Sequence, residues 1–288
     1  MRLIIVTDLD GTLLDPVTYK LGPAEPVLRR VTRAGIPLVL CSSKTRAEID
    51  ALQQSLGIWQ PFIAENGGAV VGPPDAFPPG REGPGGADAR FALELGRPYR
   101  EVVAILREVA EAERVRVVGF SDMTVGEVAA DCGLSPLDAQ LAKLREYDEP
   151  FRLVDADPAA RSGFLKALRR RGLQAVAGGR YDHAWGDTDK GRAVDVLRGL
   201  YRDRMGPVVL AGLGDAMNDL PMLRAVDRPF IVRSESHQAT ARLLREVPSA
   251  RVTVHPGPAG WAEAVTELLD DWRRDTARDR SRSWLGLV

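Results

Sequence analysis

Two aspartates, Asp8 and Asp10, stand directly behind the first apolar run of the chain, residues 3–6. The run predicts a buried β-strand, and both acids then lie at its carboxyl end, the edge at which open α/β sheets bind ligands. Neighbouring acids at a buried strand end need a cation or another partner, because desolvation and mutual repulsion disfavour their charged forms. An ordinary Asp-rich turn explains a lone pair of this kind equally well, so the choice depends on the segments that follow.

The charge and the hydropathy pattern exclude several classes of partner. A formal net charge of −1 over 288 residues provides no basic surface for nucleic acid or for an anionic membrane. No apolar run approaches the ~20 residues of a membrane span, and the apolar residues before Asp8 are too few for a signal peptide. The only two cysteines, Cys41 and Cys132, are no disulfide framework and are expected to be reduced. We therefore expect a cytoplasmic protein with no nucleic-acid and no membrane partner.

The first part of the chain alternates strand and helix patterns. Strands are predicted at residues 3–6, 36–41 and 61–64, and helices at 24–34 and from the capping box that begins at Thr45 to near Gly57. This βαβαβ order predicts a parallel sheet with right-handed crossovers.

The middle of the chain has a different rhythm. Residues 72–86 are dense in Pro and Gly, which is typical of a linker or a long loop. Beyond them, strands are predicted at 91–95, 115–118, 151–154, 173–177 and 181–184, and helices at 98–113, 124–131, from Ser135-Pro136, and at 157–171. We expect a separate α+β module inserted into the first domain.

The α/β pattern returns after Gly186. The predicted elements are helices at 190–204, 220–225 and 260–273 and strands at 208–213, 230–232 and 252–254. Residues 275–288 lack an apolar face and are expected to fray. The predicted fold class is thus α/β: a Rossmann-like parallel-sheet core (1–85 and 187–275) with an inserted α+β cap domain (86–186) and a tail (276–288).

Four short segments at strand ends or helix starts carry the reactive side chains. They contain Asp8 and Asp10, then Ser42 after the second strand, Lys190 at a helix start, and Asp215 with Asp219 after a buried strand. Each has an ordinary explanation alone: the serine as a helix cap, the lysine as a surface residue, the last segment as an Asx-turn. Their joint occurrence, all at one edge of the sheet, favours a site.

These residues supply what phosphoryl transfer requires. Asp8 can attack phosphorus as a carboxylate nucleophile, and Asp10 can protonate the leaving oxygen and then activate water. Ser42 and Lys190 can hold the equatorial phosphate oxygens. Gly11 permits a tight backbone turn.

The same acids predict a Mg²⁺ site. Hard oxygen ligands come from Asp8, Asp215 and Asp219, together with the backbone carbonyl of Asp10. The ion would offset the repulsion between nucleophile and phosphate.

The four segments together, including Thr12 in the first, resemble the motifs of the haloacid dehalogenase-like phosphatases. The resemblance implies a Mg²⁺-dependent enzyme that acts through an aspartyl-phosphate, with Asp8 as nucleophile and Asp10 as acid and base. It also implies that the inserted module is a cap that closes over the site and selects the substrate.

A narrower resemblance covers nearly the whole chain. Residues 41–48, 61–68, 145–149 and 178–180, followed by His183 and 189–191, are similar to mannosyl-3-phosphoglycerate phosphatases. The resemblance implies hydrolysis of mannosyl-3-phosphoglycerate to mannosylglycerate, a compatible solute, and some relatives also accept the glucosyl analogue. Tyr181-Asp182 stands where two aromatic residues are expected, which leaves the sugar specificity open.

The residues expected to bind this phosphorylated sugar-glycerate are Thr12, Ser43, Lys44, Glu65, Asn66, Gly179 and Arg180. Arg180 suits the glycerate carboxylate, or else forms a surface ion pair. Glu65 and Asn66 either bind sugar hydroxyls or form a plain turn. His183 is expected to be structural, since no second histidine stands at metal-ligand spacing.

Several other functions stay open at this point. They are a glucosyl-3-phosphoglycerate or broader sugar-phosphate phosphatase, a phosphomutase, a non-catalytic sugar-phosphate sensor, and a structural interaction module. The complete set of expected catalytic side chains favours the enzymes.

Overall fold

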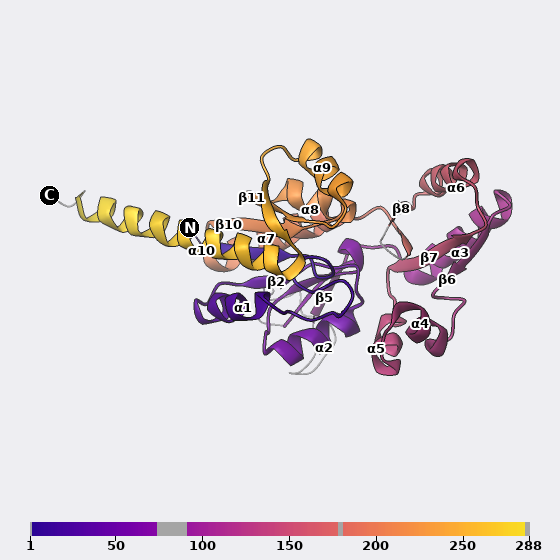
Figure 1. Cartoon of the computed structure of the whole chain (residues 1–288), viewed down its shortest axis with the longest axis horizontal. Helices are drawn as coiled ribbons and strands as arrows, with labels where there is room; N and C mark the ends of the chain where they lie inside the picture. The colour runs from indigo at the N-terminus through magenta and orange to yellow at the C-terminus, as the bar shows by residue number, and fades with distance from the viewer. Residues whose placement is uncertain (1, 74–90, 178–180, 286–288) are drawn as a thin grey trace. The chain divides into compact units, whose positions relative to one another are not determined.

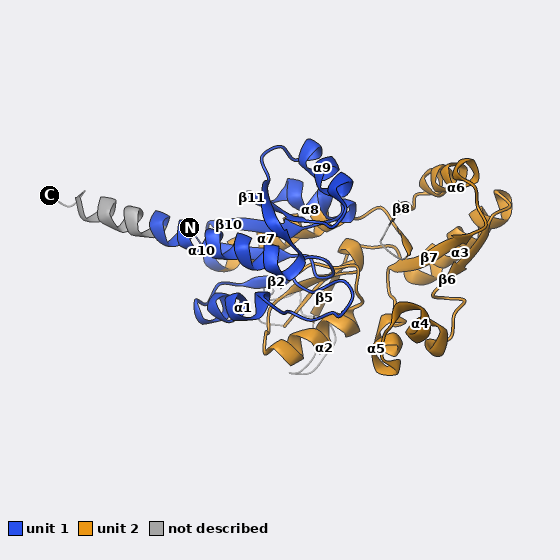
Figure 2. Ribbon diagram, viewed as in Figure 1, with its two compact units in different colours: residues 1–39, 205–288 blue, residues 40–204 orange. Residues whose placement is uncertain are grey.

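The computed structural model describes residues 2–73, 91–177 and 181–285 of the chain (Figure 1). These residues form two compact units, one of Met1–Val39 with Met205–Val288 and one of Leu40–Arg204 (Figure 2). We refer to them as unit 1 and unit 2.

A five-stranded sheet is the centre of unit 1. Its strand order is β12-β11-β10-β1-β2, and β1 pairs with β10, β10 with β11, and β11 with β12, all in parallel. The strands are β1 (Arg2–Thr7), β2 (Leu38–Leu40), β10 (Val208–Gly214), β11 (Arg228–Arg233) and β12 (Arg251–Pro256). Residues 3–7 of β1 are all buried, as expected for a strand covered on both faces.

Helices flank this sheet. They are α1 (Ala24–Arg33), the short η3 (Met217–Asp219) with α8 (Leu220–Ala225), α9 (His237–Glu246) and α10 (Gly257–Leu285). Arg30 of α1 donates to Thr266 of α10 (3.4 Å), so these two helices lie side by side. The fully buried Trp261 of α10 donates its indole N–H to the Thr7 hydroxyl (3.0 Å) and so anchors the helix to β1.

Unit 2 contains two antiparallel sheets. The first has the order β3-β4-β5, and the second β6-β7-β9-β8. The elements are α2 (Arg46–Leu56), β3 (Phe62–Ala64), η1 (Glu65–Gly67), β4 (Ala69–Gly72), β5 (Phe91–Glu94), α3 (Tyr99–Ala112), β6 (Arg116–Gly119), α4 (Val125–Cys132), α5 (Pro136–Ala142), β7 (Asp148–Val154), α6 (Pro158–Arg170), β8 (Gln174–Ala177), β9 (Asp182–Trp185) and α7 (Lys190–Met205). Helices α3 and α6 pack with the second sheet around Phe151 and Phe164, whose rings meet edge to face at 5.9 Å.

The structure confirms the predicted α/β class: a parallel sheet flanked by helices, with antiparallel sheets that suggest a cap. The division into core (1–85, 187–275) and cap (86–186) stays a prediction, because unit 2 also holds β3, β4, β5 and α7. Most of the predicted linker at 72–86 falls outside the described residues.

The third predicted strand does not extend the parallel sheet of unit 1. Instead, β3 pairs antiparallel with β4. Its parallel pairing is limited to one isolated bridge, between Ile63 and Cys41. The chain reverses here because Glu65, Asn66 and Gly67 all have left-handed φ angles (47°, 56° and 97°). A βαβ pattern does not reveal such a reversal.

Two helical predictions were also incomplete. Helix α9 was missed although its sequence is amphipathic, and Leu243 is its single buried residue. The prediction of a frayed tail was wrong as far as Leu285, because α10 continues to that residue. Once a helix exists, each further good helix former adds a backbone hydrogen bond at little cost, even without an apolar face.

Candidate active site

Two neighbouring strands of unit 1 deliver acids to the same edge of the sheet. Thr7 of β1 is in register with Leu213 of β10, and the Asp8 N–H donates to the Leu213 carbonyl (2.9 Å). Because the two strands are parallel, Asp8 and Asp215 leave the sheet side by side. In unit 1 both acids thus lie at strand ends, where the sequence predicted them.

Three carboxylates converge at this edge. One oxygen each of Asp8, Asp215 and Asp219 lies within 4.8 Å of the others. Asp8 and Asp219 are buried and Asp215 is half-buried. Three hard anionic oxygens at this spacing repel one another and fit a divalent cation such as Mg²⁺. The side chain of Asp10 is not part of this cluster, and the contact predicted for it runs through its backbone carbonyl.

Hydrogen bonds within unit 1 hold the cluster in place. One oxygen of Asp219 accepts the backbone N–H groups of Asp215 and Ala216 (3.0 Å each), which closes the loop after β10. The Thr12 hydroxyl donates to Asp215 (3.0 Å). Thr12, predicted to bind substrate, thus orients a metal-ligand candidate.

Gly11 lets the two loops approach closely. Its φ angle is +86°, and a Cβ atom built there would lie 2.7 Å from a carboxylate oxygen of Asp215. Any side chain at this position would therefore push Asp215 away, besides straining the backbone.

Ser42 and Lys190 belong to unit 2 and are both buried. The Ser42 hydroxyl accepts the Lys44 N–H (3.2 Å), and the Ser42 N–H donates to the Ile63 carbonyl (3.0 Å), so β3 fixes this segment. Lys190 begins α7 at only 1% exposure, and a buried ammonium requires anions or other acceptors. Both features suit phosphate binding, and the position of these residues beside the acids stays a prediction.

The carboxylate of Glu65 faces backbone rather than solvent. Fully buried, it accepts the N–H groups of Glu146, Tyr147 and Asp148 at 2.8–3.1 Å. Burial raises the pKa of Glu65 to about 7, against the opposing effect of the Arg145 charge and these N–H groups. This geometry gives Glu65 a structural contact, and its contact with sugar hydroxyls stays a prediction.

Two other predicted substrate ligands, Ser43 and Lys44, have contacts within unit 2. Lys44 lies 3.8 Å from Glu48, and the Ser43 carbonyl accepts a hydrogen bond from Arg145 (2.7 Å). Gly179 and Arg180 lie outside the described residues.

Sequence reasoning missed a second polar cluster in unit 2. Within the segment 145–149, which the sequence offered only as part of the family resemblance, Asp148 and Glu149 are buried and begin β7. Asp148 contacts Arg145, Asn66 and His183. Two consecutive acids in front of the apolar Phe151 are the sequence signal that could have indicated it.

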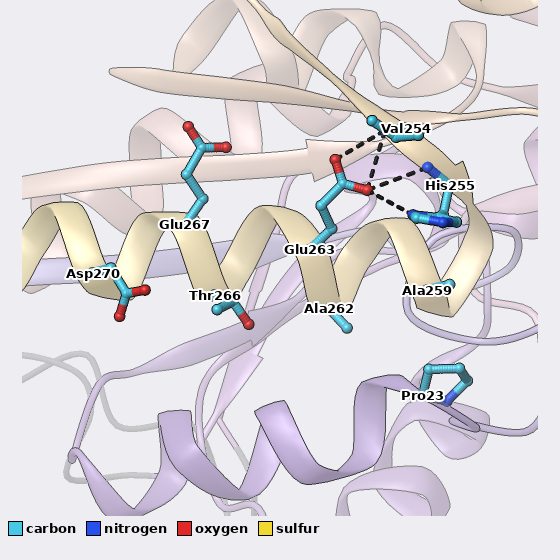
Figure 3. A pocket seen from close by; sticks show the side chains of 9 residues that line it. All are labelled: Pro23, Val254, His255, Ala259, Ala262, Glu263, Thr266, Glu267 and Asp270. Carbon is cyan, nitrogen blue, oxygen red and sulfur yellow. Dashed lines mark hydrogen bonds and ion pairs between the residues drawn. The ribbon is translucent and has the colours of Figure 1, made fainter.

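A separate pocket in unit 1 lies along α10 and is completed by the end of β12 and by Pro23 (Figure 3). Its volume is about 670 Å³, and it is lined by Pro23, Val254, His255, Ala259, Ala262, Glu263, Thr266, Glu267 and Asp270. Glu263 turns its carboxylate to the Val254 and His255 N–H groups and the His255 ring. The lining contains acids but no lysine or arginine, so the pocket is unsuited to a phosphate ester.

Among the described residues, no helix is both long and apolar enough to cross a membrane.

Comparison with known proteins decides the family. The model of the haloacid dehalogenase-like hydrolases matches residues 5–76. A glucosyl-3-phosphoglycerate/mannosyl-3-phosphoglycerate phosphatase from Methanococcoides burtonii is 40% identical over 93% of this chain and 98% of its own length. The chain belongs to the mannosyl-3-phosphoglycerate phosphatase family. Its class is accordingly that of the phosphoric monoester hydrolases of the haloacid dehalogenase-like superfamily.

Further relatives agree with this assignment. A protein of the same name from Persephonella marina is 36% identical over 94% of this chain and 99% of its own. The solved structure of a haloacid dehalogenase-like hydrolase from B. subtilis has a TM-score of 0.63 at 18% identity, and the match covers 93% of this chain and all of that one. At that identity the likeness shows the fold alone.

The close approach at Gly11 predicts a specific loss of metal affinity. In Gly11→Ala, the new methyl group displaces Asp215, and Mg²⁺ affinity should fall about tenfold or more, as measured by titration calorimetry. Gly35→Ala is the matched control, because Gly35 also has a positive φ (+65°) but no atom within 4 Å of a built Cβ. Equal affinities in the two variants would contradict the proposed constraint.

The buried carboxyl of Glu65 predicts a pH-dependent stability. Because its folded pKa of about 7 lies above the ordinary 4.5, the folded protein keeps a proton that the unfolded chain has lost. The contribution of Glu65 to the free energy of unfolding should therefore fall by about 3 kcal/mol as the pH rises through this interval, and then level off. Urea unfolding between about pH 4 and pH 8 should show this slope in the wild type but not in Glu65→Gln. Parallel profiles would refute the assignment.

Proposed function

We propose that the protein is a Mg²⁺-dependent phosphatase that hydrolyses mannosyl-3-phosphoglycerate to mannosylglycerate and phosphate. The observation that carries the proposal is the cluster of Asp8, Asp215 and Asp219 at the carboxyl ends of β1 and β10, in a chain 40% identical to a relative named for this substrate. The relatives' names include the glucosyl ester, so glucosyl-3-phosphoglycerate is the second candidate substrate.

The proposed reaction has two displacements at phosphorus. In the first, a carboxylate oxygen of Asp8 bonds to phosphorus, the ester P–O bond breaks, and Asp10 donates its proton to the leaving glycerate oxygen. In the second, Asp10 takes a proton from water as the water oxygen bonds to phosphorus. The acyl-phosphate bond then breaks, which releases phosphate and restores the Asp8 carboxylate.

The acid cluster must lower the repulsion between Asp8 and a phosphate dianion. Asp8, Asp215 and Asp219 would hold Mg²⁺, which when bound supplies the positive charge that lets the two anions meet. Thr12 and the loop N–H groups keep Asp215 and Asp219 in place, so the chain does not have to rearrange to bind the ion.

The remaining roles follow the motif order of the family. Ser42 and Lys190 are proposed to bind phosphate oxygens, and their burial agrees with a desolvated anion site. The inserted module, residues 86–186, is proposed to act as a cap that excludes water and selects the sugar-glycerate, with Ser43, Lys44, Gly179 and Arg180 as substrate contacts.

Replacement of the nucleophile tests the chemistry directly. Asp8→Asn keeps the shape of the side chain but removes its nucleophilic charge, so phosphate release should fall on the order of 10³-fold or more. Asp270→Asn, on the exposed side of α10, is the control and should keep wild-type activity. EDTA should abolish wild-type turnover and added Mg²⁺ restore it. Full turnover by the Asp8 variant would exclude the mechanism.

A substrate panel tests the specificity. The ratio kcat/KM should be highest for mannosyl- or glucosyl-3-phosphoglycerate and at least about tenfold lower for simple hexose phosphates, which lack the glycerate carboxylate. Equal values across the panel would instead identify a broad sugar-phosphate phosphatase. Binding without turnover in the presence of Mg²⁺ would favour a sensor.

A further inference from the structure

Asp148, the first residue of β7, is a fully buried carboxylate with an unusually complete set of partners. One oxygen lies 2.8 Å from Nδ1 of His183 and 3.6 Å from the Arg145 guanidinium. The other accepts a hydrogen bond from the Asn66 amide (2.6 Å). Burial alone would raise the pKa of Asp148, but the His183 contact, Arg145 and Asn66 outweigh burial and hold the pKa below its ordinary value. Asp148 is therefore ionised.

Stability alone does not account for this arrangement. Bringing a carboxylate and a guanidinium into a protein interior costs several kcal/mol per ion, and apolar residues of similar volume are often as stable. A buried carboxylate can instead serve to fix the orientation of another side chain. The side chain that Asp148 orients and that also reaches the surface is His183.

The contact with Asp148 fixes the orientation of the His183 ring. A carboxylate can only accept, so Nδ1 of His183 is the donor, and Nε2 is the ring nitrogen left for another partner. The His183 side chain is 20% exposed, whereas that of Asp148 is not exposed at all. No hydrogen-bond partner of Nε2 is found among the described residues. The ring thus presents one oriented nitrogen, Nε2, at the surface of unit 2.

The two residues before His183 are engaged elsewhere. Both carboxylate oxygens of Asp182, the first residue of β9, contact the Arg161 guanidinium (2.7 Å each), and the hydroxyl of Tyr181, just ahead of the strand, contacts Asp131. Among the described residues, Nε2 of His183 has no such contact.

The turn that holds Asp148 also contacts the segments predicted to bind phosphate. The Asn66 N–H donates to the Ser42 carbonyl (3.0 Å), while its side chain reaches Asp148. The Gly67 carbonyl accepts the Thr188 hydroxyl (3.1 Å), and a Cβ built on Gly67 would lie 2.2 Å from the carbonyl oxygen of Asp189, the residue before Lys190. One rigid turn therefore ties His183, through Asp148, to both predicted phosphate-binding segments.

We propose that His183 determines substrate specificity, its Nε2 forming a hydrogen bond with a hydroxyl group in the sugar-glycerate part of the substrate while Asp148 fixes the ring. The inference rests on the proposed function. A hydroxyl group suits Nε2, because a hydroxyl can both donate and accept a hydrogen bond. Asp148 is the positioning residue, since it acts through His183.

The test separates the two nitrogens of the ring. In His183→Asn, the amide N–H replaces Nδ1 and keeps the bond to Asp148, but no atom replaces Nε2. In His183→Gln, the longer side chain restores a polar group near the position of Nε2. Both purified variants are assayed with mannosyl-3-phosphoglycerate and with p-nitrophenyl phosphate, which carries no hydroxyl group.

With the sugar substrate, His183→Asn should raise KM about tenfold, and His183→Gln should recover part of that loss. Kinetics with p-nitrophenyl phosphate and the urea midpoint should stay within about twofold of the wild type for His183→Asn, because the Asp148 contact survives. A purely structural histidine would leave KM unchanged for both substrates, or would lower both activities together with stability, and either result overturns the inference.

The outcome also distinguishes failure of the inference from failure of the proposed function. A wild-type enzyme that hydrolyses the sugar substrate, next to an unaltered His183→Asn variant, rejects the role of His183 alone. A wild-type enzyme that releases no phosphate from mannosyl- or glucosyl-3-phosphoglycerate with Mg²⁺ rejects the function on which the inference rests.

Discussion

Electrostatic repulsion among three carboxylates is the constraint around which unit 1 is arranged. Asp8, Asp215 and Asp219 would separate if their loops were free, and a cation site would not form. The protein keeps them within 4.8 Å by fixing each at its base. Asp8 is held by the parallel pairing of β1 with β10, Asp219 by two backbone N–H groups, and Asp215 by the Thr12 hydroxyl. The carboxylates are thus preorganised for a cation.

Unit 2 also contains buried acids, and their carboxylates are stabilised by two different kinds of partner. Glu65 and Asp148 are both fully buried acids, but Glu65 is satisfied by backbone N–H groups, whereas Asp148 is satisfied by side chains of Arg145, Asn66 and His183. The pKa values reflect this difference, since that of Glu65 is raised and that of Asp148 is lowered. Glu65 therefore keeps its proton to a higher pH than Asp148 does. Asp148 orients a histidine, and Glu65 joins a turn to the first residues of β7.

The motifs allowed the parallel sheet and its acids to be predicted, because both depend on local order in the sequence. Asp8 directly follows a buried strand, so its position at the carboxyl end of that strand can be read from the sequence. The alternation of strands and helices then predicts that the neighbouring strands are parallel. What could not be predicted depends on distant partners. Thr12 was assigned to substrate because nothing near it in the sequence shows that Asp215, 203 positions away, accepts its hydroxyl. Glu65 is a polar residue of the kind that binds sugar hydroxyls. The N–H groups that donate to its carboxylate come from residues 146–148, which are far away in the sequence.

The left-handed turn at Glu65, Asn66 and Gly67 has a consequence for the order of folding. Non-glycine residues in this conformation cost roughly 1–2 kcal/mol each, and the contacts that compensate come from a segment 81–83 positions further along the chain. The turn is therefore unstable in a nascent chain that ends before residue 146. We expect β3 and β4 to pair late, only after that segment has docked, so that Ser42 acquires its final backbone contacts at the end of folding rather than at the start.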